Sequence, residues 1–125
     1  MNWIWVAVGS ALGGSARYAV ALWLPHQPGR WPVATFTVNV LGSFAIGCVF
    51  AWWSLRSAQA EGLRLFLMTG ILGGFTTYSA FALEASLLDG AVPGLRAVGY
   101  AVATVVGCVG AALAGRRLFE VILVG

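Results

Sequence analysis

The segment from about Leu63 to Leu88 combines two features that conflict in an ordinary helix. It is long and apolar enough to cross a bilayer, which takes about 20 residues, yet residues 70–81 hold three glycines, two threonines and a serine. Glycine inside a helix costs about 1 kcal/mol relative to alanine, and threonine hydroxyls compete for backbone hydrogen bonds. In lipid, non-helical backbone survives only where protein or a water-filled cavity covers it. The segment therefore predicts a broken helix inside an assembly, with freed carbonyls and amides that can bind ions.

The remainder of the chain is also apolar. Of its 125 residues, 60% are hydrophobic and 9% are charged, which is typical of a membrane protein and not of a soluble domain. A cleaved signal peptide is not expected, because no basic residue precedes the first apolar run and the run is too long. We predict an all-α membrane protein in which residues 1–125 form a single transmembrane domain. Its four spans lie at about residues 3–24, 31–55, 63–88 and 95–114.

Charge and cysteine content argue against several classes of function. The net charge is +3 and all seven basic residues are arginines, but they are scattered and mostly lie at the ends of spans, unlike a nucleic-acid-binding surface. Cys48 and Cys108 lie within apolar runs, and the sequence has no CxxC or Cys/His cluster of the kind that binds metals. No paired nucleophile and base is visible, so we do not expect an enzyme.

Two polar residues inside the first two spans each have two interpretations. Asn39 lies about 12 Å of helix after Trp31, near the middle of a hydrocarbon core about 30 Å thick, where a primary amide needs hydrogen-bond partners. It either joins two helices or lines a pore. Arg17 lies about two helical turns before Pro25. It either extends to the nearby interface or faces an aqueous vestibule, where its charge concentrates anions.

A row of three side chains follows the glycine-rich stretch. Tyr78, Phe81 and Glu84 are spaced i, i+3 and i+6, so they share one face of a helix. The aromatic pair is either ordinary packing or part of an ion path. Glu84, near the end of the same face, is either a solvated residue or a group of the vestibule.

The fourth span carries a second polar row, and the first span carries a packing motif. Tyr100, Thr104 and Cys108 recur every four residues and form one ridge with a phenol, a hydroxyl and a thiol. Gly9 and Gly13 form a GxxxG pair, which favours close contact between helices in a membrane.

The arginines give little preference for one orientation in the membrane. With four spans both termini share a side, and a small charge difference between the two sides is expected of a protein that inserts both ways. Four thin helices are also too few to enclose a pore around a broken helix. Both points suggest an antiparallel homodimer. The side of the termini carries Arg56, Arg64, Arg116 and Arg117, and the other side carries Arg30 and Arg96.

Three motifs together resemble the Fluc (CrcB) family of fluoride channels. They are Gly-Gly-Ser-Ala-Arg-Tyr at 13–18, Thr-Phe-Thr-Val-Asn at 35–39, and Gly-Ile-Leu-Gly-Gly-Phe-Thr-Thr-Tyr-Ser-Ala-Phe at 70–81. The resemblance covers essentially the whole chain. It implies an antiparallel, dual-topology homodimer of four-helix subunits in the inner (plasma) membrane. It also implies two pores that export fluoride passively from the cytoplasm and so relieve fluoride toxicity.

The resemblance further implies roles for individual residues. A structural sodium ion (Na+) at the dimer interface would be held by the backbone carbonyls of Gly73 and Thr76. Arg17 matches the vestibule arginine of the family. Hydrogen-bond donors and aromatic ring edges can replace the water shell of fluoride. On this basis the pore is lined by Asn39, Tyr78, Ser79, Phe81, Tyr100, Thr104 and Cys108.

The sequence departs from the family pattern at a few of these positions. Tyr78 stands in place of a phenylalanine, and Cys108 stands where a hydroxyl is common. A thiol is the weaker donor. Ala80 stands where Ser or Thr is common, and Ala34 where a glycine often begins the second motif. These departures bear on the conductance and on the course of the ion path.

Two other classes of membrane protein compete with this interpretation. A small multidrug-resistance-type transporter also has four spans and dual topology, but cation export needs an embedded carboxylate in the first span. That span carries Arg17 and no acidic residue. A subunit that only assembles with others would explain the glycines. It would not explain the Thr/Ser/aromatic stretch or the position of Asn39 level with it.

Overall fold

The computed structural model describes residues 1–56, 61–88, 90 and 93–125. Every regular element in this part of the chain is helical, which confirms the predicted all-α class. The connections expected before the third and fourth spans fall largely on residues 57–60, 89, 91 and 92, which lie outside the described residues. The elements are α1 (Asn2–Trp23), α2 (Val33–Ser54), α3 (Glu61–Arg64), the π-helix η1 (Leu65–Leu72), α4 (Gly73–Phe75), α5 (Tyr78–Ser86) and α6 (Leu95–Val124).

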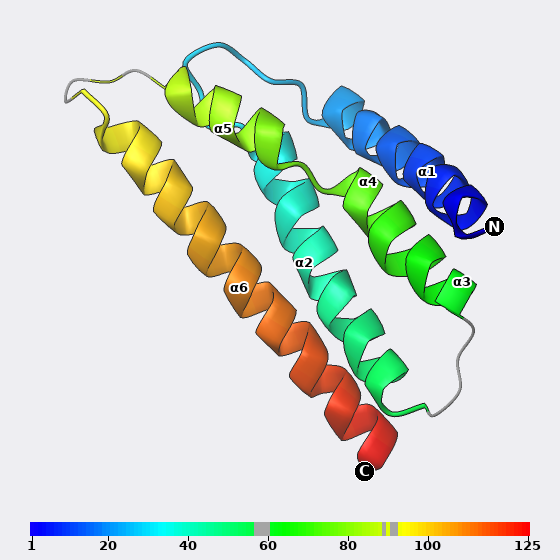
Figure 1. The fold of residues 1–125 in the computed structure, drawn as a ribbon. Helices are drawn as coiled ribbons and strands as arrows, with labels where there is room; N and C mark the ends of the chain where they lie inside the picture. The colour runs from blue at the N-terminus through cyan, green and yellow to red at the C-terminus, as the bar shows by residue number, and fades with distance from the viewer. Residues whose placement is uncertain (57–60, 89, 91–92) are drawn as a thin grey trace.

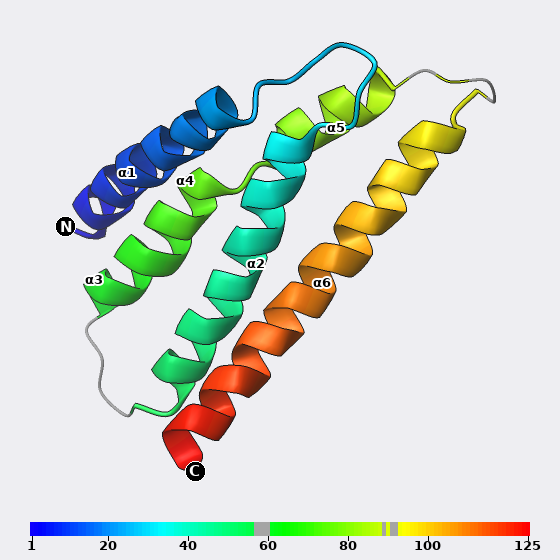
Figure 2. The same ribbon diagram turned by 180° about the vertical axis from the view of Figure 1, so that it is seen from behind.

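The helices lie side by side in an order that differs from their order in the sequence. Elements α3, η1 and α4 follow one another as a single rod, which packs between α1 and α2. Helix α6 covers the other side of α2, and the view from behind shows the same order (Figures 1 and 2). Helix α5 continues beyond the rod and approaches α6. Residues on α2 can therefore contact both the rod and α6.

Three helical segments in the described part of the chain are long and apolar enough to cross a membrane. They are Val33–Ser54, Glu61–Ser86 and Leu95–Val124, which correspond to the second, third and fourth expected spans. Helix α1 has a sufficient length of 22 residues but is not among them, because its glycines and serines, together with Arg17, lower its mean hydropathy. The existence of a membrane-embedded first span therefore stays a prediction.

Glycines set the closest approach of α1 to the rod. A Cβ added at Gly9 would lie 2.5 Å from the carbonyl oxygen of Phe66, and one at Gly13 would overlap the carbonyl oxygen of Ile71. Both neighbours are backbone atoms, which cannot move aside as a flexible side chain can. The GxxxG pair therefore makes the close helix contact that its spacing predicts.

The rod ends at Phe75, and the helix resumes as α5 at Tyr78. We call the two residues between them, Thr76 and Thr77, the break. Thr76 has φ −82° and ψ 160°, and Thr77 has φ −151° and ψ 122°, so both are extended. The glycines of this stretch, from which the interruption was predicted, are themselves helical: Gly70 lies in η1, and Gly73 begins α4. Gly70 and Gly74 pack closely against the backbone of α1, whereas the two β-branched residues take the extended conformation that suits their shape.

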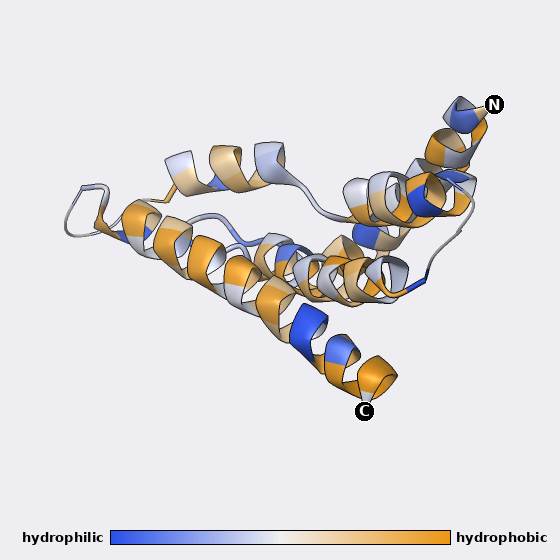
Figure 3. Ribbon diagram, turned by 60° about the horizontal axis from the view of Figure 1, so that its bottom comes forward, coloured by the Kyte–Doolittle hydropathy of each residue, from blue (hydrophilic) through white to orange (hydrophobic). Residues whose placement is uncertain are grey.

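Helix α6 extends well beyond the expected end of the fourth span at about Ala114. It continues through Arg116 to Val124, so the apolar tail is helical. Figure 3 shows the hydrophilic turn that precedes this apolar tip. Arg116 pairs with Glu120 one turn later, with 3.3 Å between Nε and Oε1, and this pair lets the helix continue through its charged turn.

Candidate functional site

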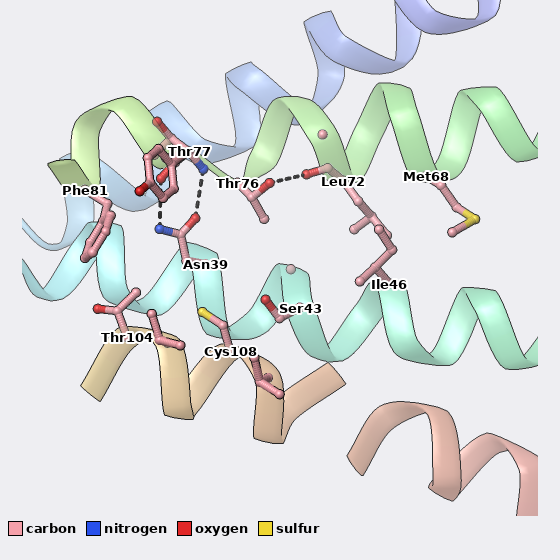
Figure 4. Close-up of a pocket in the computed structure, with 15 residues that line it drawn as sticks. Asn39, Ser43, Ile46, Met68, Leu72, Thr76, Thr77, Phe81, Thr104 and Cys108 are labelled. Atoms are coloured by element: carbon pink, nitrogen blue, oxygen red, sulfur yellow. Dashed lines mark hydrogen bonds between the residues drawn. The ribbon is translucent and has the colours of Figure 1, made fainter. Parts of the chain in front are cut away.

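A hollow of about 420 Å³ lies beside the break, and we call it the groove. Its walls come from α2, from the rod and α5, and from α6 (Figure 4). Elements far apart in the sequence thus place polar and aromatic side chains around one space. The groove is lined by Asn39, Gly42, Ser43, Ile46, Met68, Leu72, Gly73, Thr76, Thr77, Tyr78, Phe81, Thr104, Val105, Cys108 and Val109.

Asn39 holds the break through two hydrogen bonds. Its Nδ2 donates to the carbonyl oxygen of Thr77 at 2.9 Å, and its Oδ1 accepts from the backbone N–H of Thr77 at 2.8 Å. The side chain is buried, so these bonds satisfy an amide that would otherwise be costly to bury. Both interpretations offered for Asn39 apply to its position: it joins α2 to the rod, and it also lines the groove.

The two threonines of the break use their hydroxyls locally. Thr76 Oγ1 donates to the carbonyl oxygen of Leu72 at 2.9 Å, one turn before the end of the rod. Thr77 Oγ1 accepts from the N–H of Ala80 at 3.3 Å and so caps the start of α5. The methyl group of Thr76 packs on Gly42 so closely that a Cβ there would overlap it. Sequence and packing therefore fix the break at this level of α2.

The break diverts the backbone donors that an unbroken helix would direct to Gly73 and Thr76. The N–H of Thr77, four residues after Gly73, donates to Asn39 Oδ1. The N–H of Ala80, four residues after Thr76, donates to Thr77 Oγ1. Carbonyls at a helix C-terminus lose their helical donors in this way. Gly73 and Thr76 both line the groove.

An aromatic row crosses one end of the groove. Phe81 is only 8% exposed and lies between Tyr78, at 5.5 Å between ring centroids, and Tyr100, at 5.3 Å. Trp31 meets Tyr100 edge to face at 5.5 Å. Tyr78, by contrast, is 80% exposed. The two aromatic residues that follow the break thus have different environments, and Phe81 is the one held in place by packing.

Two polar groups on α6 are buried next to this row. The hydroxyls of Tyr100 and Thr104 lie near each other, but within the described part of the chain neither makes a hydrogen bond of normal length and angle. A buried polar group left without a partner costs about 1–3 kcal/mol, so these hydroxyls favour a polar occupant beside them. Thr104 lines the groove together with Cys108. Tyr100 lies behind the groove wall, with 0% of its surface exposed.

A second, smaller hollow of about 160 Å³ lies on the other side of the break, and we call it the vestibule. It is lined by Arg17 of α1, Thr35 of α2 and Glu84 of α5, among others. Thr35 Oγ1 donates to Glu84 Oε1 at 3.0 Å, while Glu84 Oε2 is buried and, among the described residues, has no partner. Arg17 Nε donates to the carbonyl oxygen of Gly74 at 3.1 Å. Two residues predicted to lie at a vestibule are thus brought together.

Comparison with known proteins agrees with this geometry. The model of the family described as CrcB-like protein, Camphor Resistance (CrcB), matches residues 4–116. The chain belongs to the CrcB family. A protein of Methylobacterium sp. (strain 4-46), named fluoride-specific ion channel FluC, is 44% identical over 92% of this chain and 90% of its own length. Similar proteins of the same name in Chloroflexus aurantiacus and Methylobacterium nodulans are both 42% identical, over 85% and 95% of this chain and 85% and 98% of their own lengths.

Most of the predicted site residues of this CrcB chain meet at the groove. Ser79 is an exception: it is exposed on α5 and does not line either hollow. The remaining predicted residues divide between the two hollows and the packed aromatic row. Asn39, Gly73, Thr76, Tyr78, Phe81, Thr104 and Cys108 line the groove, Arg17 and Glu84 line the vestibule, and Tyr100 is buried behind the groove.

Sequence reasoning assigned no individual role to Thr35 or Thr77, both of which line the hollows of this CrcB chain. Thr35 lies four residues before Asn39, so the two share a helix face, and this spacing was a usable signal. Thr77 touches both hollows and supplies the backbone groups that Asn39 binds. Its role depends on a contact between distant segments, which a single sequence does not display.

Proposed function

We propose that this CrcB chain forms a fluoride-selective channel that lets fluoride leave the cytoplasm passively and relieves fluoride toxicity. The names of its relatives support the choice of ion. The structural support is the groove, which offers several different donors to a small anion while most of its remaining wall is apolar. No step in this function requires bond making or bond breaking, so we propose a conductor and not an enzyme.

The chemistry of fluoride matches the groups around the groove. Fluoride is small and strongly hydrated, so a narrow path must replace its water with other donors. The Thr104 hydroxyl makes no hydrogen bond of normal geometry among the described residues, and Asn39 Nδ2 keeps a second hydrogen after binding Thr77. Ring edges are positive, and Phe81 faces the groove from its packed position. The start of α5 at the break adds the positive end of a helix dipole.

We infer that the working unit is an antiparallel homodimer with two pores. A single chain leaves much of its apolar surface exposed, including a row of valines on α6 (Val98, Val102, Val105, Val106 and Val109). Such surface in a membrane protein is covered by lipid or by another subunit. A second copy beside the groove would supply the wall that one chain lacks. The weak arginine bias supports opposite orientations for the two copies.

We further propose that a structural sodium ion binds at the interface of the two copies. The carbonyls of Gly73 and Thr76 fit this ion, because hard cations prefer oxygen ligands and unwound membrane helices use backbone carbonyls for sodium. Two carbonyls from each copy would provide four ligands. When bound, sodium supplies positive charge between the two breaks. The protein's own part is to hold the carbonyls toward the interface, through the Asn39 and Thr77 bonds.

Flux measurements in liposomes test the proposed ion. Purified protein is reconstituted into vesicles loaded with either potassium fluoride or potassium chloride, and efflux is started with a potassium ionophore and followed with ion-selective electrodes. We expect rapid fluoride efflux and chloride efflux at the rate of protein-free vesicles. Equal rates for the two halides, or no fluoride efflux, would contradict the proposal.

A further inference from the structure

Arg17 binds the break at one atom. Its Nε donates to the carbonyl oxygen of Gly74 at 3.1 Å, across 57 positions of sequence and in a partly buried setting. In an unbroken helix that carbonyl would accept from the N–H of Tyr78, the residue that begins α5. Gly74 is therefore one of the last residues of the first half-helix, whose carbonyls need other donors. Arg17 supplies such a donor from α1.

The bond divides the carbonyls at the end of the rod into two groups. Gly74 O is occupied by Arg17, whereas Gly73 and Thr76 line the groove and are the proposed sodium ligands. Asn39 of α2 makes two hydrogen bonds with the backbone of Thr77. The break is thus held from both sides, by Arg17 on α1 and by Asn39 on α2. The Gly73 and Gly74 carbonyls belong to adjacent peptide groups that meet at the Gly74 Cα, so the bond to Arg17 lies one peptide group away from the Gly73 carbonyl.

The positive charge of Arg17 also stabilises the end of the rod. A positive group near the C-terminus of a half-helix interacts favourably with its dipole. Glu84 lines the same vestibule, but its Oε1 accepts from Thr35. Arg17 Nε is therefore directed to the backbone of the rod.

We propose that Arg17 is a positioning residue for the sodium site, in addition to any effect of its charge on anions in the vestibule. By holding Gly74 O, it fixes the end of the rod so that the carbonyls of Gly73 and Thr76 face the interface. This inference rests on the proposed function, because it requires the sodium site proposed above.

Positioning and simple electrostatics predict opposite effects of removing Arg17. A nearby positive charge repels a cation, so if charge alone mattered, its removal would strengthen sodium binding. If Arg17 positions the carbonyls, its removal weakens sodium binding. Arg17→Lys distinguishes positioning from the effect of charge, because lysine keeps the charge but places a methylene carbon where arginine has Nε–H.

The experiment measures the melting temperature of the purified protein as sodium replaces potassium at constant ionic strength. Wild type, Arg17→Met, Arg17→Lys and Arg30→Gln are compared. Arg30 is an exposed arginine in the connection that follows α1, so its removal changes charge near the same end without touching the break. For Arg17→Met and Arg17→Lys we expect the sodium concentration at half-effect to rise about tenfold or more, the scale of a lost hydrogen bond to a charged group. For Arg30→Gln we expect the wild-type value.

Each outcome decides between the alternatives. Tighter sodium binding in Arg17→Met, or an unchanged value in Arg17→Lys, overturns the positioning role while leaving the sodium site intact. A wild-type protein that responds equally to sodium and potassium has no such site, and then both the site and this inference fail. If Arg17→Met does not fold, Arg17→Lys alone decides, because its charge is unchanged.

Discussion

At the scale of single residues, the site depends on amide and aromatic groups whose partners are known from the structure. Asn39 is the clearest case, because one side chain meets both the N–H and the carbonyl of Thr77. An amide can do this since it offers a donor and an acceptor together. A carboxylate of the same shape offers only acceptors, so it cannot donate to the Thr77 carbonyl as the Asn39 amide does.

We expect Asn39→Asp to abolish most fluoride flux. The carboxylate would set an acceptor against the Thr77 carbonyl and place a negative charge beside the anion path. The lost bond and the unpaired carbonyl should also lower the free energy of unfolding by about 1–3 kcal/mol. Asn2→Asp makes the same chemical change at an exposed position and should leave flux unchanged. Flux is measured in liposomes, and undiminished flux from Asn39→Asp would exclude a role for Asn39 in conduction.

Phe81 and Tyr78 should differ in importance, because only Phe81 is packed in the aromatic row. We expect Phe81→Ile to lower the fluoride rate about tenfold or more, since the change removes the ring edge that faces the groove. Phe50→Ile, on the half-exposed face of α2, is the matched control and should conduct normally. A wild-type rate in Phe81→Ile would show that ring edges do not contribute to the path.

At the scale of helices, the sequence placed a poorly helical stretch within residues 70–81 but did not indicate which of its residues would be extended. Glycine and threonine in residues 70–81 indicated a poor helix, and the structure contains one. The extended residues are the two threonines, while Gly70 and Gly74 stay helical and pack against the backbone of α1. The π-helix from Leu65 to Leu72 packs against α1 and was not predicted from the sequence. Composition predicts that a segment is a poor helix, whereas tertiary contacts determine which of its residues leave the helical conformation.

The contact between α1 and the rod gives a matched pair of glycine substitutions. We expect Gly13→Ala to lower the melting temperature, because its Cβ would overlap the carbonyl oxygen of Ile71, and such overpacking costs about 1–3 kcal/mol. Gly14→Ala meets nothing within 4 Å. It should be neutral or stabilising, since alanine is the better helix former by about 1 kcal/mol. Thermal unfolding in detergent measures both, and equal effects would mean that α1 does not pack as closely as the structure shows.

At the scale of the whole molecule, the proposed function requires more wall than a single chain provides. Its groove lies along the side of the bundle, between α2, the rod and α6, and much of the large apolar surface around it is exposed. Spacing and the resemblance named most of the residues that line the two hollows, because each motif is local in the sequence; their role in conduction stays a prediction. The pairing of two copies was also expected from the sequence, but it stays a prediction, since no contact within one chain tests it. Orientation in the membrane is therefore the property to test.

Variants locked in one orientation test the antiparallel dimer. Three lysines added before Trp3 bias the N-terminus toward the cytoplasm, and three added at the exposed connection beside Arg30 bias it outward. If the dimer needs one copy of each orientation, each variant expressed alone should give little flux. Expressed together, the two variants should restore flux toward the wild-type level, because each supplies the partner that the other lacks. Accessibility of tags at the termini confirms the orientations. Full flux from either locked variant alone would show that parallel copies, or single chains, suffice for conduction.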